Sequence, residues 1–542
     1  MSKQLFQEKF DQWSDSAWNS CMDVIFYRLT RSVMRVKNLN TKGLHSKVLK
    51  LCNVPHLESH ANAATNKIRT ELIKKRTMRQ LLSTFIEIGH LYLDYPLYYG
   101  TRLDFRLRMY PLQYLLSRTT GYLKNILQES IQKRLTKRGM QNMLEAYYSP
   151  HKKVLLKFKN TLPMNNDQMF EFFMSNKVNI KDLPLYFELL KIEISDLFNK
   201  TGSDRKTALQ LEIDQVGSGP TFVALLTGNK ELAKRCNLLE GEFECIYTYL
   251  LKETIVFFDK NNNFDIELNN EDITERKAYK LLTQDRKAQK YALMCFFYNE
   301  EHRGRTNRWK EQYQEEFGIT PAHLDYKILS KFSVIYDEFM DYCFPNLSKQ
   351  LDILNEAITI LVKQNLPAKI ETLDGCILSW DFADTVELKR SVYNPVSGCH
   401  EQIKVKIDTR NTDKKSNKRI ARHKRSFRPN LIHSIDAAIM RIFLQEFNKK
   451  TKRRLNHLHD CVMLHPNDVD IFFDIVTEVY CRPNMRTLAK DLFFSRIKKD
   501  LVGEPLNAIN KIENKFYDNM EDFSLTKESF DPRKCYRYEG TE

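Results

Sequence analysis

Two aspartates, far apart in the chain, each stand at the edge of an apolar run. Asp214 closes the run in "TALQLEIDQVGSG", just before two glycines, and Asp460 interrupts "LNHLHDCVMLH" directly after His459. Asp is depleted in strands and rarely buried unless paired, so both positions need a chemical reason. A carboxylate at a strand end beside glycines can hold a divalent cation while a substrate approaches closely. The pattern predicts a strand ending at Asp214 and a strand–turn–strand around Asp460.

A third segment, "RKAQKYALMCFFYN", repeats at four-residue spacing. Arg286, Lys290, Met294 and Tyr298 fall at i, i+4, i+8 and i+12. On a helix each such step advances by about 400°, so the four side chains share one slowly turning stripe. Two cations, a thioether and a phenol on that stripe could grip a triphosphate at one end and a base and sugar at the other.

Each segment alone also has an ordinary interpretation. Asp214 could open a turn, the stripe could be a solvated basic helix end that runs into a buried end, and His459–Asp460 could be a core histidine beside a capping Asp. A zinc site formed by His457, His459 and His465 is a further alternative, but no Cys lies at ligand spacing.

Together, two carboxylates and a cationic helix are the parts of a two-metal nucleotidyl-transfer site. Two Mg²⁺ ions about 3.5–4 Å apart activate an attacking 3′ hydroxyl and stabilise the leaving pyrophosphate. Mg²⁺ is usually held by one or two carboxylates plus substrate phosphates, which suits a site with two Asp. A positioned cation can neutralise or protonate the departing phosphates.

The composition indicates a large globular protein with a polyanionic partner. The chain has 542 residues, 42% of them hydrophobic, and 85 Lys and Arg against 69 Asp and Glu leave a net charge of +16. This length exceeds what one core supports, so two or more domains are expected. The charge favours nucleic acid as the partner, with an anionic membrane surface as the second choice.

Several classes of protein are disfavoured. The 11 cysteines include no C-x-x-C pair, which is typical of reduced, mostly buried thiols in an intracellular protein. No uninterrupted apolar run reaches about 18 residues, so a membrane-spanning helix is not expected. The opening "MSKQLFQEKFDQWSDSAW" resembles neither a signal peptide nor a transit peptide.

The fold class predicted from hydrophobic periodicity is α+β, predominantly helical. Apolar residues at three- and four-residue spacing predict helices over residues 1–100 and most of 230–350. Residues 369–407 read as strands, including a hairpin at 385–407 around "NPVSG". A very basic segment follows, and then a helix is expected to begin near "HSIDAAIMRIFLQEF".

These segments resemble motifs A, B and C of the single-subunit RNA polymerases of phages and mitochondria, relatives of the family A DNA polymerases. The motif B pattern R-x3-K-x3-M-x3-Y matches the stripe from Arg286 to Tyr298, motif C matches His459–Asp460, and motif A begins at Asp214. Three further segments fit in the same order: "DFRLRMYP" resembles D-x-R-G-R-x-Y, "TLDGCILSW" resembles a T-x-D-G strand, and "RPNLIHSID" resembles P-N-x-x-H-S-x-D. The resemblance runs from about residue 70 to 500.

The resemblance implies a right-hand polymerase fold of palm, fingers and thumb with a small antiparallel palm sheet. The expected domains are a helical, thumb-like N-terminal region (1–100), a first palm part (101–235), fingers (236–368), a strand and specificity-hairpin-like insertion (369–430), and a second palm part with the C-terminal region (431–542).

It also implies roles for individual residues, with two Mg²⁺ ions per active site. The expected metal ligands are Asp214, the backbone carbonyl of Gln215, and Asp460, and His459 supports them. The expected catalytic residues are Asp214, Asp460, Lys290 and Tyr298. The expected nucleotide-binding residues are Arg286, Lys290, Met294, Tyr298, His433 and Gly219. The expected template- or RNA-binding residues are Arg106, Arg108, Lys124, Lys389 and Arg390.

Three positions favour ribonucleotides over deoxyribonucleotides. The family A DNA polymerases carry a Glu at the position of Gly219, an aromatic residue at Met294 and a Glu at Cys461. That first Glu fills the space a ribose 2′-OH would need. The resemblance also assigns Tyr298 and His433 to reading this hydroxyl, and a site that hydrogen-bonds a substrate hydroxyl discriminates strongly against analogues lacking it. The alternatives are a family A-like DNA polymerase or primase and, from another class, an inactive DNA-binding subunit of a larger transcription complex.

The chain departs from the family pattern in several places. Leu107 and Asn299 each stand where the family has Gly, and the ending "KCYRYEGTE" lacks the apolar aromatic ending of the phage enzymes. Only about 100 residues precede "DFRLR", so a partner protein or another means is expected to replace the N-terminal promoter-binding domain. The hairpin at 385–407 lies where relatives have their specificity loop.

The expected function is DNA-templated RNA synthesis, with a DNA template, nascent RNA and rNTPs as partners, a possible second protein subunit, and no membrane. A viral enzyme in host cytoplasm or in a virion is expected, with a mitochondrial enzyme as the alternative.

Overall fold

The strands that bracket Asp214 and Asp460 form one antiparallel sheet. In the computed structural model, β10 (Asn456–Leu458), β11 (Cys461–Leu464), β5 (Leu211–Gln215) and β12 (Tyr536–Tyr538) lie in the order β10-β11-β5-β12. Both predicted strand segments are therefore confirmed, and β5 and β11 are direct neighbours. The structure describes residues 101–111, 132–143, 145–146, 168, 171–172, 175–176, 206–261, 281–300, 302–317, 322–382, 385–394, 399–408, 417–453, 455–521 and 523–538. The predicted helical region 1–100 and Lys124 lie outside these ranges.

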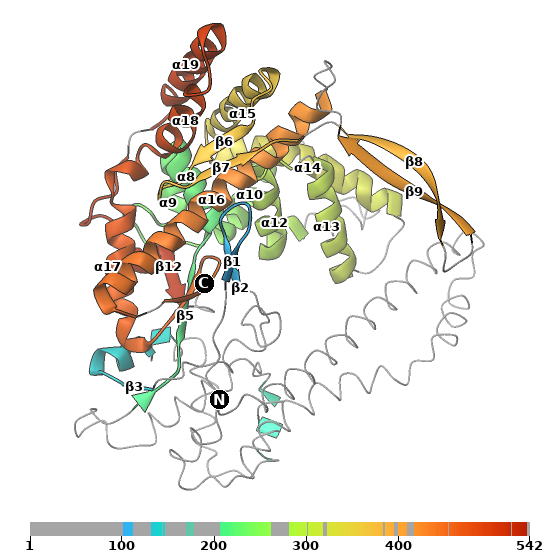
Figure 1. Cartoon of the computed structure of the whole chain (residues 1–542). Coiled ribbons are helices and arrows are strands. Elements are labelled where there is room, and N and C mark those ends of the chain that lie inside the picture. The colour runs from blue at the N-terminus through green and yellow to red at the C-terminus, as the bar shows by residue number, and fades with distance from the viewer. Residues whose placement is uncertain are drawn as a thin grey trace, which may run out of the picture.

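The sheet is covered by helices that follow its strands in sequence. α8 (Ser218–Thr227) leaves β5 directly, α17 (Val469–Tyr480) follows β11, and the long α16 (Asn417–Thr451) packs against both. Figure 1 shows α16 running obliquely across the molecule, with α17 and the sheet near its C-terminal end. Side chains on the strands, such as Ile213 and Val462, and on the covering helices, such as Phe472, are fully buried. The sheet's inner face is thus part of the core.

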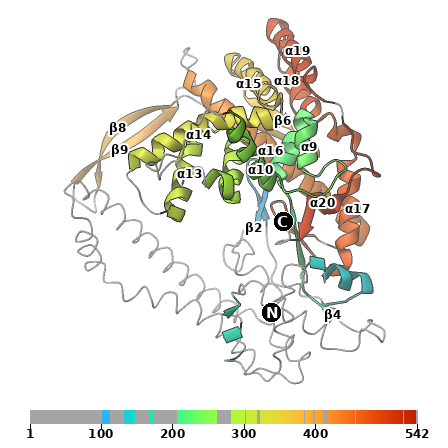
Figure 2. The same cartoon turned by 180° about the vertical axis from the view of Figure 1, so that it is seen from behind.

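A helical region follows β5 in sequence, as predicted. It consists of α9 (Lys230–Arg235), α10 (Ile246–Asn261), α12 (Arg286–Phe297), α13 (His302–Phe317), α14 (Ala322–Cys343) and α15 (Leu347–Lys363). α12 packs on α8, α10 and α13, while α15 packs on α16 and on α19 (Gly503–Tyr517). Figure 2 shows α13 and α14 on the side of the molecule away from α17. Buried Trp309 and Phe297 belong to the same core as Ile213.

Short hairpins and turns complete the described structure. The paired strands are β1 (Thr101–Leu103) with β2 (Met109–Pro111), β3 (Lys133–Arg134) with β4 (Lys206–Thr207), β6 (Ala368–Glu371) with β7 (Ile377–Trp380), and β8 (Thr385–Asn394) with β9 (Cys399–Asp408). Further helical pieces include η4 (Pro466–Asp468), η5 (Pro483–Met485), η6 (Lys490–Phe494), α18 (Ser495–Lys498) and α20 (Pro532–Cys535). The predicted hairpin around "NPVSG" is confirmed, and β8–β9 extends away from the body of the molecule (Figure 1).

One predicted boundary was wrong. The sequence predicted a helix that begins near His433, but α16 begins at Asn417 and takes in the preceding basic residues. Proline is disfavoured in a helix interior, yet Pro429 lies inside α16. The helix continues upstream because Lys and Arg are good helix formers and because His423 and Phe427 are fully buried there.

Most of the described cysteines are buried, as the sequence indicated. Cys236, Cys245, Cys295, Cys343, Cys461 and Cys535 are buried free thiols, and Cys376 is an exposed one. Among the described residues, no helix has the length and apolar character needed to span a membrane.

Candidate active site

The structure brings the two aspartates together, Asp214 on β5 and Asp460 in the turn that leads into the neighbouring β11. Ile213 pairs with Val462, so by the same register Asp214 stands level with Cys461, one residue from Asp460. Both carboxylates are half-buried. Asp460 occupies the two-residue turn between β10 and β11, since Leu458 pairs with Cys461. The two predicted metal-binding carboxylates therefore lie at the same end of the sheet.

His459 gives this turn its shape. Its φ is +55°, the left-handed region that the first turn residue of a tight hairpin adopts. Its ring packs edge-on against Tyr110, with ring centroids 5.1 Å apart. Burial and the nearby Arg108 guanidinium lower the pKa of His459, so the ring is neutral at neutral pH. This geometry fits the predicted supporting role.

The "DFRLR" segment forms the turn between β1 and β2. The Asp104 carboxylate accepts hydrogen bonds from the backbone N–H of Arg106 (2.8 Å) and of Arg108 (3.0 Å), and from the Arg106 side chain (2.9 Å). Leu107 has φ +63°. The family's Gly at this position therefore has a structural reason, since only Gly adopts this conformation without strain.

A relay of hydrogen bonds connects this turn to the end of α12. Arg106 Nη1 lies 2.8 Å from His433 Nδ1, and His433 Nε2 lies 3.0 Å from the Tyr298 hydroxyl. Burial, with the positive charges of Arg108 and Arg106, lowers the pKa of His433 to about 3, so the ring is neutral. Arg can only donate, which makes Nδ1 the acceptor and leaves the proton on Nε2. His433 then donates to Tyr298, whose own proton is free to point into the site.

Arg108 is bound by a carboxylate on α16, close to His433 in sequence. It forms an ion pair with Asp436, which is 5% exposed and lies three residues after His433 on α16. Burial and the charge of Asp460 raise the pKa of Asp436 to about 6, while Arg108 opposes this shift. Asp460 also raises the pKa of Arg108. Arg108 therefore interacts electrostatically with the carboxylates of both Asp436 and Asp460.

Arg441 was not predicted from the sequence. It donates to both oxygens of Asp374 (2.6 and 2.8 Å) and to the backbone carbonyl of Leu107 (2.6 Å). It therefore joins the "TLDG" hairpin of β6–β7 to the "DFRLR" turn. Its spacing offered a signal, because Arg441 follows His433 by eight residues and so lies on nearly the same helix face.

The predicted stripe on α12 is confirmed as a helix face, with Tyr298 as the residue that ends the helix. Arg286 and Lys290 both contact the Tyr247 ring, at 5.1 and 5.7 Å from its centroid. Arg286 also donates to the Cys245 sulfur at 3.3 Å. Burial would raise the pKa of the Cys245 thiol, but the Arg286 and backbone hydrogen bonds outweigh it and lower that pKa. Cys245 lies directly before α10, Tyr247 is the second residue of that helix, and no sequence pattern indicated either residue.

Gly219 and Met294 are neighbours across the α8–α12 contact. A Cβ placed on Gly219 would lie 3.5 Å from the Met294 sulfur. A longer side chain at residue 219 would therefore have to occupy the space beside Met294.

Asn299, the second residue that stands at a family Gly position, has φ +54°. Leu107 and Asn299, which both stand at family Gly positions, thus both have left-handed backbone.

The predicted residues Lys389 and Arg390 lie on the β8–β9 hairpin. Register pairs Lys389 with Lys404 and Arg390 with Ile403 in the β8–β9 ladder, and Arg390 is exposed. Within the described ranges, no group of three or more His, Cys, Asp and Glu side chains could hold a metal ion, so no zinc site forms at His457, His459 and His465. Two carboxylates with a backbone carbonyl form a smaller, all-oxygen set of the kind that Mg²⁺ uses.

Comparison with known proteins identifies the family. Residues 153–529 match the family model of DNA-dependent RNA polymerase. The chain is 24% identical over 485 residues to a probable DNA-directed RNA polymerase of Agaricus bitorquis, covering 83% of this chain and 41% of that protein. It is 23% identical over 354 residues to a probable DNA-directed RNA polymerase of Podospora anserina, covering 60% of this chain and 35% of that protein.

The match spans most of the chain and includes the segments of motifs A, B and C. The chain therefore belongs to the DNA-dependent RNA polymerase family, as its motifs indicated. It spans about two-fifths of the length of the first relative and about a third of the second.

Proposed function

We propose that this chain carries out DNA-templated RNA synthesis, joining rNTPs to a growing RNA and releasing pyrophosphate. One observation carries the proposal: Asp460, in the turn that leads into the strand next to Asp214, acts electrostatically on Arg108, Asp436 and Tyr298 at once. The carboxylates, the "DFRLR" turn and the end of α12 thus converge on one site. In this proposal the four-stranded sheet with α16 and α17 is the palm, and α10 to α14 belong to the fingers.

Asp214, Asp460 and the Gln215 carbonyl would hold the Mg²⁺ ions. When bound, these ions would lower the pKa of the attacking hydroxyl and neutralise charge on the phosphates. Lys290 is exposed near the start of α12, where it can meet the triphosphate and give a proton to the leaving pyrophosphate. Arg286, one turn earlier, adds a second cation for the same phosphates.

The relay from Arg106 to Tyr298 supports RNA as the product. With Nε2–H of His433 donated to it, the Tyr298 hydroxyl presents a donor to a ribose 2′ oxygen. Burial raises the pKa of Tyr298 to about 12, so this donor keeps its proton at physiological pH. A deoxyribonucleotide would leave the donor unpaired, which disfavours that substrate. Gly219 leaves the space of the hydroxyl open.

Other parts of the expected function stay predictions. They are the domain boundaries, the thumb-like region, contacts of Lys124, Lys389 and Arg390 with template or RNA, and promoter reading by the β8–β9 hairpin. A second subunit, a viral origin, and a location in host cytoplasm, in a virion or in mitochondria also stay predictions.

The decisive test is Asp460→Asn, assayed by extension of an RNA primer on a DNA template with Mg²⁺. Wild type should extend with rNTPs, and the variant should lose at least about a hundredfold in rate, since a ligand of the catalytic ions is lost. Asp474→Asn, which removes an exposed carboxylate of α17, should retain full activity. Equal, negligible extension by wild type and Asp460→Asn would favour an inactive DNA-binding subunit. Preferred use of dNTPs would favour a DNA polymerase.

A further inference from the structure

Three buried side chains close a ring of hydrogen bonds on the opposite face of β5 from Asp214. The Gln215 amide donates to the Tyr480 hydroxyl at 2.8 Å and accepts from the Tyr536 hydroxyl at 3.2 Å. The two hydroxyls lie 3.3 Å apart. Gln215, Tyr480 and Tyr536 are only 4%, 0% and 2% exposed. We refer to these three residues as the Gln–Tyr–Tyr ring.

The bonds of the ring run in one direction. Tyr536 donates to Gln215, Gln215 donates to Tyr480, and Tyr480 can donate back to Tyr536. Each hydroxyl then donates once and accepts once, so none of the three polar groups is left unsatisfied in the core. Burial raises the pKa of both tyrosines well above the usual value, so the ring stays neutral and intact at physiological pH. Such closed networks rigidify their members.

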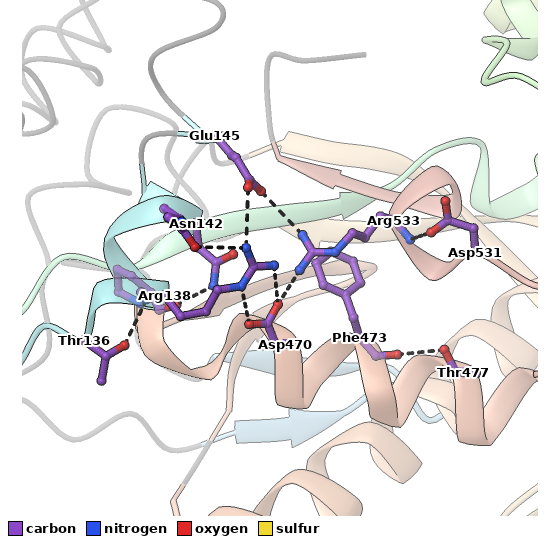
Figure 3. Close-up of polar contacts among 12 residues, drawn as sticks. Thr136, Arg138, Asn142, Glu145, Asp470, Phe473, Thr477, Asp531 and Arg533 are labelled. Carbon is purple, nitrogen blue, oxygen red and sulfur yellow. Dashed lines mark hydrogen bonds and ion pairs between the residues drawn. The ribbon is translucent and has the colours of Figure 1, made fainter.

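The ring joins three segments that are distant in sequence. Gln215 ends β5, Tyr480 ends α17, and Tyr536 begins β12 and pairs with Gln215 in the sheet. The other end of α17 is tied to the same C-terminal segment, because Arg533 forms an ion pair with Asp470 and lies 4.4 Å from the centroid of the Phe473 ring (Figure 3). Both ends of α17 therefore hold the C-terminal segment against β5.

The backbone beside the ring has a defined direction. The Val216 N–H donates to the Cys535 carbonyl at 2.8 Å, so it points toward the C-terminal segment. In a trans peptide the preceding carbonyl points the opposite way. The Gln215 carbonyl therefore points away from β12 and toward the side of β5 on which β11 and Asp460 lie. This direction suits a shared cation ligand.

We propose that Gln215, Tyr480 and Tyr536 are positioning residues that orient the Gln215 carbonyl and the adjacent Asp214 carboxylate for a divalent cation. The inference rests on the proposed function, which supplies the cation. The ring fixes the side chain of residue 215 at two atoms, and Cys535 fixes the next peptide plane. Rotation of the residue 215–216 peptide would break the hydrogen bond from Val216 to Cys535, and a shift of the Gln215 backbone that moved the carbonyl out of the site would break the hydrogen bonds of the ring.

The test measures cation binding rather than turnover. Binding of Mn²⁺ to the full chain with an RNA-primed DNA template is followed by the electron paramagnetic resonance of free Mn²⁺. Wild type should show a site that Asp460→Asn removes. Tyr536→Phe and Tyr480→Phe, which keep shape and lose one hydroxyl, should each weaken this site about three- to tenfold. The Mg²⁺ concentration for half-maximal RNA extension should rise by a similar factor, with a smaller change in the KM for rNTP.

Tyr336→Phe is the matched control, because Tyr336 also donates to a buried glutamine, Gln289, at 3.3 Å. It should lower the thermal midpoint about as much as the ring variants and leave Mn²⁺ binding unchanged. The double variant Tyr480→Phe/Tyr536→Phe should weaken binding by less than the product of the two single effects, because one ring is broken in either case.

The outcomes separate the two proposals. If both single variants fold and bind Mn²⁺ as tightly as wild type, the positioning role is overturned and the proposed function stands. If Tyr336→Phe weakens the site equally, the effect is one of general stability, and the positioning role is again overturned. If wild type has no Asp460-dependent Mn²⁺ site, the proposed function itself fails.

Discussion

The two sides of the site are held by different kinds of contact. On the side that would meet the ribose, the sugar side, polar groups bind one another in series: Arg106, His433 and Tyr298 form the relay, and Asp436 pairs with Arg108. On the side that would meet the triphosphate, the phosphate side, Arg286 and Lys290 contact the Tyr247 ring, and Arg286 contacts the Cys245 sulfur.

The difference follows from what each side would have to recognise. Discrimination of one hydroxyl requires a donor at a fixed place with a fixed proton, and a relay of matched donors and acceptors supplies it. A triphosphate requires positive charge that is not already neutralised. An aromatic face attracts a cation without cancelling its charge, so the contact with Tyr247 can orient Lys290 and leave it able to bind phosphate. The comparison thus predicts different consequences for mutations on the two sides.

The largest effect is expected on the phosphate side. Lys290→Ala should lower kcat/KM for rNTP incorporation at least about a hundredfold, because a cation that stabilises the developing charge on the leaving phosphates is removed. The ratio of rNTP to dNTP use should stay within about twofold of wild type. Single-nucleotide extension kinetics with both substrates measure the two quantities.

Lys287→Ala is the control on the same helix. Lys287 is also exposed, but it lies off the stripe that Lys290 shares with Arg286. Its loss should change incorporation by less than about threefold. A large loss of selectivity in Lys290→Ala, or equal losses in both variants, would contradict the assignment of Lys290 to the phosphates.

The sugar side carries a smaller, more specific prediction. In Arg106→Ala the tautomer of His433 is no longer fixed, so Tyr298 no longer presents its proton reliably. Selectivity for rNTP over dNTP should fall about tenfold, the value of about one hydrogen bond, while the rate with rNTPs falls much less. Loss of the nearby positive charge should also raise the pKa of His433 above about 3, which ¹⁵N NMR of the ring can measure.

Arg102→Ala provides the comparison, because Arg102 is exposed on β1 of the same hairpin. It should leave both the selectivity and the His433 resonances unchanged. Arg106→Ala with unaltered selectivity and an altered His433 tautomer would show that the relay does not govern sugar choice.

The sequence predicted what depends on local pattern. Strands at Asp214 and Asp460, the α12 stripe and the β8–β9 hairpin are each visible as a run or spacing within a few residues. The sequence did not predict Arg441, Tyr247 or the Gln–Tyr–Tyr ring, because each of these acts through residues that only the tertiary fold brings near. Tyr480 and Tyr536 read as ordinary aromatic residues in or beside apolar segments.

Two further features show where pattern reading ends. β12 has three residues, too few for periodicity to show, so the C-terminal strand beside Asp214 was not predicted. Leu107 and Asn299 were visible as departures from family glycines. Only the backbone angles show that the conformation those glycines would adopt is kept despite the substitution.

The smallest expected effect lies in the turn that positions the sugar side. Leu107→Gly and Leu107→Ala both remove a half-buried side chain, but only Ala retains a Cβ that is strained at φ +63°. Left-handed backbone costs a residue with a Cβ about 1–2 kcal/mol, which exceeds the entropic disadvantage of Gly. The Gly variant should therefore unfold at the higher temperature, by the equivalent of about 1 kcal/mol. At Leu506, inside α19, the order should be the usual one, with Ala the more stable. If Ala were more stable than Gly at both positions, the turn would not need its left-handed residue, and the sugar side would depend on its side-chain contacts alone.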